Sequence, residues 1–159
     1  MSGKRIIGII LAGGLAYIVI KGMVNAPVQS ESDTLRAKVE AGMQERQDEE
    51  SRIAALKTYS AQDIAKAYSR NTVAADLTFK DQQFKVTGVV GEINTDYRGR
   101  AYVILKGGVN RYMDPHFTIS DNQKYLAADL QQGAEIMLAC TGRGDVAKTP
   151  MAGECSFVQ

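Results

Sequence analysis

Two cysteines carry the most specific chemical prediction of this sequence. Cys140 and Cys155 are the only cysteines of the 159-residue chain, and each lies in a segment that alternates as a β-strand does. The midpoint between them falls at Lys148, so a hairpin of the two segments would place the two thiols opposite each other. We therefore predict a structural disulfide in an exported compartment, with two reduced, buried thiols as the alternative.

No set of side chains has the pattern of a catalytic or metal site. The chain has one histidine, His116, and no Cys-x-x-Cys pair, which disfavours a redox or metal site. A histidine base needs an oriented nucleophile or acid partner, and nearby Asp114 is equally typical of a turn. We predict that the protein is not an enzyme and uses no metal or cofactor.

Aromatic and arginine side chains concentrate around one expected hairpin and the loop after it. These candidates for a binding face are Tyr97, Arg98, Arg100, Tyr102, Arg111 and Tyr112. The segment from Phe79 to Gln159 has nine Lys or Arg and nine Asp or Glu residues, whereas nucleic-acid binding requires a surplus of positive charge. We therefore expect a protein, peptide or glycan partner in the cell envelope rather than nucleic acid. Single-stranded nucleic acid is the alternative, because aromatic and cationic side chains also bind it.

The N-terminal segment decides in which compartment these residues work. No residue from Ile6 to Ile20 is charged, and the apolar run then continues with Lys21 as its one charge. Residues 4–5 are basic, and positive charge favours the cytoplasmic side. We predict a single-pass inner-membrane anchor over residues 1–26, with the N-terminus cytoplasmic and the C-terminal domain periplasmic or otherwise extracytoplasmic. The alternatives are a signal peptide cleaved after Ala26, which also exports the chain, and a buried soluble helix.

A charged helical stalk is predicted over residues 27–58. The segment has no proline after its first position, and its apolar residues fall on one helical stripe: Leu35, Val39, Met43, Ile53 and Leu56. Arg46 and the pair at 49–50 interrupt this stripe. We expect a solvated stalk that holds the next domain away from the membrane. A short coiled coil that dimerises the protein weakly and a partly disordered segment are the alternatives.

Residues 59–159 form the expected globular domain. A helix with Ser60 and Asp63 at its start comes first, and the alternation then changes to the two-residue period of strands. The expected strands are 84–90, 101–105, 116–120, 134–146 and 151–158, with a short helix over 121–133. Gly88 and Gly91 indicate a bend in the first strand. This order predicts a mainly β fold with helices, the five-stranded Greek-key barrel called the OB-fold, with an open sandwich as the alternative.

The spacing Tyr-x-x-Asn-x-x-Ala-Ala-Asp begins a set of residues that recurs in a known family. The set is Tyr68, Asn71, Ala74, Ala75, Asp76, Phe79, Lys80, Val86, Gly88, Val90, Tyr102, Leu105, Leu130, Gly133, Gly142 and Cys155. With it, the chain resembles the tRNA_anti-like family of bacterial OB-fold proteins over residues 60–158. The resemblance implies an exported protein or lipoprotein without a demonstrated activity. The chain departs from the lipoprotein members by lacking a lipidation cysteine, and it has no cysteine near Phe117, where relatives are expected to carry one.

Overall fold

The computed structural model of the chain describes residues 28–110 and 112–158. The membrane anchor predicted over residues 1–26 lies outside the described residues, and so does Arg111. Within the described part of the chain, no helix combines the length and the apolar character needed to cross a membrane. Contacts divide the chain into two units, one ending at Glu50 and the other beginning at Ser51.

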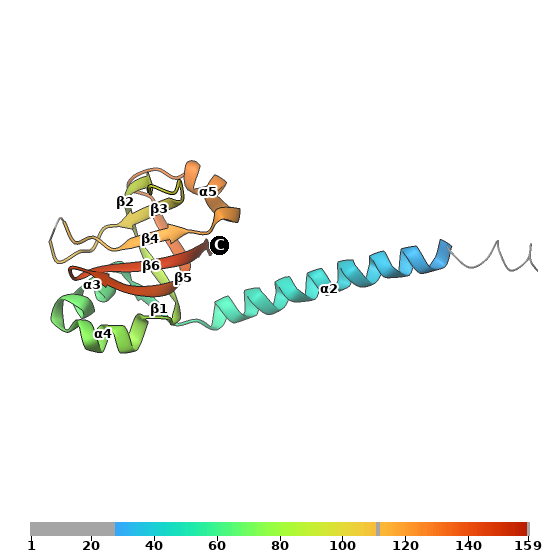
Figure 1. Ribbon diagram of the computed structural model, residues 1–159, viewed down its shortest axis with the longest axis horizontal. Coiled ribbons are helices and arrows are strands. Elements are labelled where there is room, and N and C mark those ends of the chain that lie inside the picture. The colour runs from blue at the N-terminus through green and yellow to red at the C-terminus, as the bar shows by residue number, and fades with distance from the viewer. Residues whose placement is uncertain (1–27, 111, 159) are drawn as a thin grey trace, which may run out of the picture. The chain divides into compact units, whose positions relative to one another are not determined.

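The helices and strands are labelled in Figure 1. In chain order they are α2 (Val28–Ala55), β1 (Thr58–Ser60), α3 (Ala61–Arg70), α4 (Thr72–Phe79), β2 (Gln83–Thr95), β3 (Ala101–Leu105), β4 (His116–Ile119), the 3-10 turn η1 (Asp121–Gln123), α5 (Lys124–Ala128), β5 (Glu135–Val146) and β6 (Thr149–Phe157).

The predicted stalk is present as one continuous helix, α2. Its apolar side chains Leu35, Val39 and Met43 are exposed, and the Gln44 amide donates to Asp48 one turn away at 2.9 Å. An exposed stripe of this kind is consistent with a solvated helix and with a weak helix pair. Dimerisation through α2 and the spacing from a membrane therefore stay predictions.

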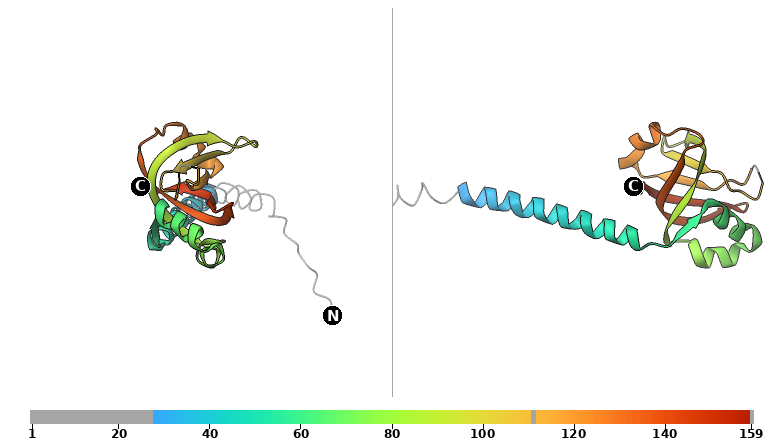
Figure 2. Two further views of the ribbon diagram at one scale, coloured as in Figure 1. Left: turned by 90° about the vertical axis from the view of Figure 1, so that its left-hand side faces the viewer. Right: turned by 180° about the vertical axis from the view of Figure 1, so that it is seen from behind.

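Five strands close into a barrel. β2 pairs antiparallel with β5 through its first half, from Gln83 opposite Thr141 to Val89 opposite Glu135, and with β3 through its second half. β3 pairs antiparallel with β4, β4 runs parallel to β6, and β6 pairs antiparallel with β5. The ring β2-β3-β4-β6-β5 thus returns to β2, as Figure 2 shows from two sides. The predicted OB-fold barrel is confirmed and the open sandwich is wrong; β1, a short parallel addition to β2, was not predicted.

The bend predicted in the first strand lies at Gly91. The register of β2 against β3 shifts between Val90 and Glu92, so β2 bulges where it changes partner. Val90 exchanges two backbone hydrogen bonds of 2.8 Å with Gly133 and Ala134, just before β5 begins. These bonds fix the point at which the strand leaves one neighbour and joins the next.

The hydrophobic core fills the barrel and continues under α3 and α4. The inward positions of the strands are fully buried, among them Val86, Val90, Val103, Leu105 and Leu138. Each such side chain contributes roughly 1.5–3 kcal/mol by leaving water. Phe79 of α4 joins the two parts, because its ring packs edge-on against Phe84 at 5.5 Å and lies 6.0 Å from Tyr68 of α3.

A second helix, α4, follows α3 and was not predicted. The cap at Ser60 is confirmed, since its hydroxyl oxygen accepts the Asp63 N–H at 3.0 Å. Asn71 ends α3, but its side-chain oxygen also accepts the Ala74 N–H at 3.2 Å and so starts α4. The Tyr68 hydroxyl donates to Asp76 at 3.1 Å and ties the two helices together.

The helix between β4 and β5 is shorter than predicted. It consists of η1 and α5, which ends at Ala128 instead of near Gly133. Tyr125 is 65% exposed, and Ala127 is the buried residue of α5. A small side chain lets this short helix pack closely on the end of the barrel, where the Lys124 ammonium donates to the Gly99 carbonyl at 2.8 Å.

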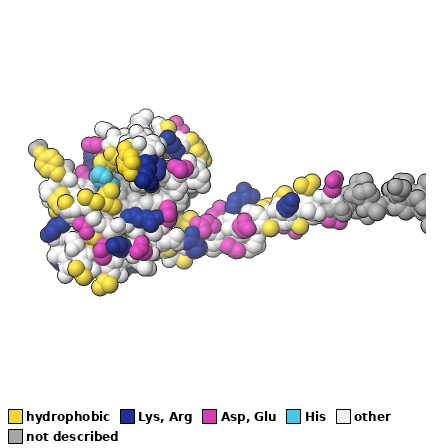
Figure 3. Space-filling view, viewed as in Figure 1, with side chains coloured by type: hydrophobic (Ala, Val, Ile, Leu, Met, Phe, Trp, Pro, Cys, Tyr) yellow, Lys and Arg dark blue, Asp and Glu magenta, His cyan; other side chains and the backbone are white. Residues whose placement is uncertain are grey.

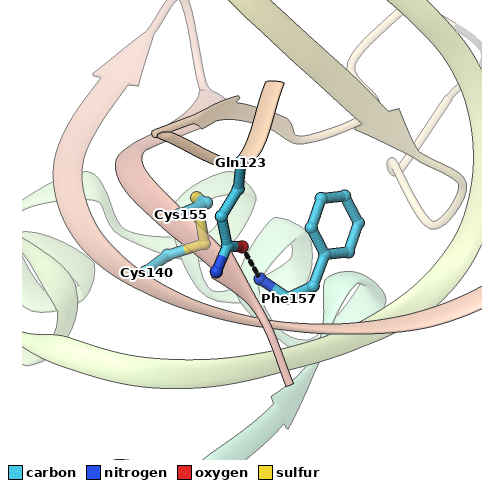
Figure 4. Close-up of a disulfide and its surroundings, with 4 residues drawn as sticks. All are labelled: Gln123, Cys140, Cys155 and Phe157. Carbon is cyan, nitrogen blue, oxygen red and sulfur yellow. Dashed lines mark hydrogen bonds between the residues drawn. A yellow bond between two sulfur atoms is a disulfide. The ribbon is translucent and has the colours of Figure 1, made fainter. Parts of the chain in front are cut away.

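The predicted disulfide is present. Cys140 of β5 and Cys155 of β6 are bonded to each other inside the barrel, and both are buried. Figure 4 shows the bond beside the end of β6, where the Phe157 N–H donates to the Gln123 side chain at 2.6 Å. Cys155 also lies opposite Ile119 of β4. The cross-link therefore holds β5 and β6 together in the middle of the core.

Candidate binding site on the outer face of the barrel

The structure separates the predicted binding residues along one strand. Tyr97, Arg98 and Arg100 lie in the turn between β2 and β3, Tyr102 lies on β3, and Tyr112 lies in the loop between β3 and β4. The turn and the loop are at opposite ends of β3, and the loop projects at the left of Figure 1. The predicted residues that the structure describes thus do not form one cluster, but they border one surface, the outer face of β2, β3 and β4.

Asp96 organises the turn at one end of this face. One carboxylate oxygen accepts the backbone N–H groups of Arg98 and Arg100, both at 2.9 Å, and the other accepts Arg100 Nε at 2.8 Å. The Arg100 backbone N–H, together with the other hydrogen bonds, holds the pKa of Asp96 below its usual value. Arg98 lies over the ring of Tyr97 at 5.3 Å, and Tyr97 is 88% exposed. The turn therefore presents a cation–π pair to solvent, while Arg100 is bound to Asp96.

Asp114 organises the loop at the other end. One of its carboxylate oxygens accepts the N–H groups of Gly107 and Gly108 at 3.0 and 2.7 Å. A Cβ at Gly108 would lie 2.5 Å from the backbone of Met113, and Gly107 has a φ of +142°. Only glycine fits these two positions, and the fold of the loop holds Tyr112 at 74% exposure.

Between the turn and the loop, outward side chains of three strands stand in two rows. Glu92, Ile104 and His116 are opposite one another across β2, β3 and β4, and Asn94, Tyr102 and Thr118 form the next row. The rings of Tyr102 and His116 stack at 5.6 Å with 13° between their planes. We call this surface the six-residue face.

Burial sets the protonation state of His116. Burial lowers the pKa of this imidazole, while the carboxylates of Glu92 and Asp114 act in the opposite direction. The lowering prevails, so the neutral imidazole dominates at neutral pH. A neutral ring carries one hydrogen-bond donor and one acceptor, and one side of it stacks on the ring of Tyr102.

A small pocket opens beside the first row. Its volume is about 210 Å³, and its lining side chains are Glu92, Ile104, Lys106, Tyr112, Asp114 and His116. Figure 3 shows the histidine in cyan among hydrophobic side chains, with Lys and Arg interspersed with Asp and Glu over the same view. Of this lining, Tyr112 is predicted from the sequence as a binding residue, whereas His116 and Asp114 are not. Knowledge of the register between the strands would have placed His116 at the site, but that register cannot be read from the sequence alone.

The comparisons with known proteins concern the family and the fold. The tRNA_anti-like family model matches residues 1–155, and no curated protein matches the chain. A solved structure of a candidate nucleic acid-binding lipoprotein from Klebsiella pneumoniae subsp. pneumoniae has a TM-score of 0.57 and 17% identity, covering 69% of this chain and 97% of that one. That likeness shows a shared fold.

Two further solved structures are more distant. RecG bound to a three-way DNA junction has a TM-score of 0.42 and 9% identity, covering 64% of this chain and 12% of that one. Rim1, a mitochondrial single-stranded DNA-binding protein from S. cerevisiae, has a TM-score of 0.35 and 13% identity, covering 51% of this chain and 97% of that one. At these scores neither structure bears on the function of the chain.

Proposed function

The chain belongs to the tRNA_anti-like family, and from that premise we propose that it is a non-catalytic binding module of the cell envelope. Its six-residue face binds a protein, peptide or glycan partner. Residues 1–26 anchor it in the inner membrane as a single span, with the N-terminus cytoplasmic and the barrel on the extracytoplasmic side.

One observation carries the binding proposal, namely the stacked Tyr102–His116 pair beside the 210 Å³ pocket. Both rings are half-buried on a surface whose two ends are set by Asp96 and Asp114. A ligand therefore meets side chains whose positions are already fixed, which lowers the entropy lost on binding. Tyr97 and Tyr112 add exposed aromatic surface at the two ends, and aromatic side chains are enriched at interfaces.

The disulfide bond supports the proposed extracytoplasmic location of the barrel. Disulfides persist in oxidising compartments and are rare in the cytosol, and the bond between Cys140 and Cys155 is buried in the core. Fractionation of cells with intact-mass measurement of the full chain tests it. We expect an uncleaved, oxidised protein in the membrane fraction. Full-length protein in the soluble fraction with two free thiols would contradict the proposal.

Site-specific photo-crosslinking in cells tests the binding face. A benzophenone side chain at Thr118 should give a covalent adduct with a partner, and the adduct should disappear when His116→Ala is added. Leu77 of α4, which is 84% exposed, is the control position. The same adducts from both positions, or none from Thr118, would count against this face.

A second candidate function is single-stranded nucleic-acid binding. The Arg98–Tyr97 pair is an exposed platform on which a base can stack, and the K. pneumoniae protein is named for nucleic-acid binding. The equal numbers of basic and acidic residues from Phe79 onward disfavour nucleic-acid binding, which requires a surplus of positive charge. Titration with a fluorescent oligo-dT at low and moderate salt tests it: tight, steeply salt-dependent binding that Tyr97→Ser weakens would favour this candidate over the first.

A further inference from the structure

The size of the pocket limits what can enter it. Sites for small-molecule ligands usually enclose about 300–1,000 Å³, and this pocket encloses about 210 Å³. It therefore takes one ring or one side chain of a longer molecule, and the rest of that molecule lies on the face outside.

Two carboxylates, Glu92 and Asp114, and one ammonium group, Lys106, line the pocket. The Glu92 carboxylate already accepts the Asn94 amide at 3.1 Å, and the Asp114 carboxylate already accepts two backbone N–H groups. The two carboxylates repel a phosphate. Because both carboxylates already accept hydrogen bonds within the protein and Lys106 repels a cationic side chain, an uncharged group fits best.

The remaining polar groups suit hydroxyls. Glu92 and Asp114 accept hydrogen bonds, Lys106 donates them, and the Tyr112 phenol and the neutral His116 ring do both. A hydroxyl group also donates and accepts, and Ile104 offers an apolar floor to the C–H side of a saturated ring. We propose that the pocket binds one uncharged, hydroxyl-bearing ring, a single sugar residue of a glycan chain. The inference rests on the proposed function of the six-residue face.

The face also has room for the rest of the chain. The second row, Asn94, Tyr102 and Thr118, continues from the pocket toward the turn at Asp96. β3 has five residues, which span about 16 Å at about 3.3 Å each. Neighbouring sugar rings can therefore follow β3 over polar side chains and the Tyr102 ring.

Saturation-transfer NMR on the full chain in lipid nanodiscs tests the inference. The probes are the trimer of N-acetylglucosamine and maltotriose, both at millimolar concentration. Irradiation of the protein should transfer saturation to ring protons of at least one trisaccharide, and His116→Ala should weaken that binding at least tenfold. Lys106→Ala, at an exposed position, is a second variant that should weaken it without a folding defect, and Tyr125→Ala on α5 is the matched control that should not.

The outcomes separate this inference from the proposed function. No transfer to either trisaccharide overturns the glycan inference, as does equal binding by wild type and both pocket variants. If the adduct at Thr118 persists in that case, the face still binds a partner, and that partner is a protein or peptide. If the adduct is absent as well, both proposals fall.

Discussion

Loss of the disulfide should remove a large part of the stability of the barrel. The bond joins cysteines separated by 15 residues. A cross-link over a loop of that length restricts the unfolded chain, which corresponds to about 3 kcal/mol at 25 °C. The whole free energy of unfolding of a domain is about 5–15 kcal/mol. The reduced protein should therefore remain folded only if the rest of the core is well packed.

Two perturbations separate the cross-link from packing. Reduction breaks the bond but leaves both sulfurs in the core, where Cys140 is 2% and Cys155 is 0% exposed. The double variant Cys140→Ala/Cys155→Ala also removes the sulfurs and leaves cavities, which adds about 1 kcal/mol or more. The expected order of stability is oxidised wild type, then reduced wild type, then the double variant.

Urea unfolding of the full chain, with and without reductant, measures these differences. With a slope of about 1–3 kcal/mol/M, a loss of 3 kcal/mol lowers the midpoint by about 1–3 M. The double variant is the control, because reductant should not change its midpoint. An unchanged wild-type midpoint, in a sample where labelling shows that both thiols are free, would refute the loop-entropy reasoning.

Three further predictions concern packing, backbone strain and charge. Gly142→Ala should lower the free energy of unfolding, measured in urea, by about 3 kcal/mol or more, because its Cβ would lie 2.0 Å from the Phe79 carbonyl oxygen. Gly42→Ala on α2 is the control: its Cβ would meet nothing within 4 Å, so the urea midpoint of the barrel should not change. An equal loss of stability in both variants would contradict the packing argument. Ala147→Asn should raise the free energy of unfolding by about 1 kcal/mol in thermal unfolding, because Ala147 has a φ of 51° that asparagine tolerates better; a decrease would count against strain at this turn. Burial lowers the pKa of His116 from 6.5, so the unfolded chain binds the imidazole proton more readily than the folded protein does. The contribution of His116 to the free energy of unfolding should be complete above pH 6.5 and fall as the pH drops toward the lowered pKa. His116→Asn should reduce this dependence of stability on pH, and the same dependence in wild type and variant would contradict a lowered pKa.

The strands of the barrel could be predicted from the sequence because their signal is local. Phe84, Val86 and Val90 are buried and alternate with half-buried positions, and Gly91 marks the bulge. The elements that escaped prediction depend on partners far along the chain. β1 has three residues and exists through its pairing with β2. α4 follows α3 after one residue, Asn71, whose side chain caps α4, and this second helix was not predicted.

The binding site was predicted in part, for a related reason. Clustering along the sequence brought together Tyr97 and Tyr112, which β3 holds apart in space. The row that lines the pocket joins Glu92 to Ile104 and His116 across three strands, and its alignment depends on the bulge at Gly91. Register of this kind is set by hydrogen bonding between strands, so the residue pattern of any single strand does not contain it.

The outward positions of the barrel favour one of its two candidate functions. An OB barrel can bind an oligonucleotide or an oligosaccharide on the same strands, so the fold alone does not choose. The six residues of the face include one carboxylate, Glu92, and no lysine or arginine. In the turn at the end of this face, Arg100 is bound to Asp96, and Arg98 lies over the ring of Tyr97. A phosphate backbone along β3 would meet Lys106 next to the carboxylates of Glu92 and Asp114, which repel it, whereas uncharged hydroxyl groups would meet donors and acceptors already in position.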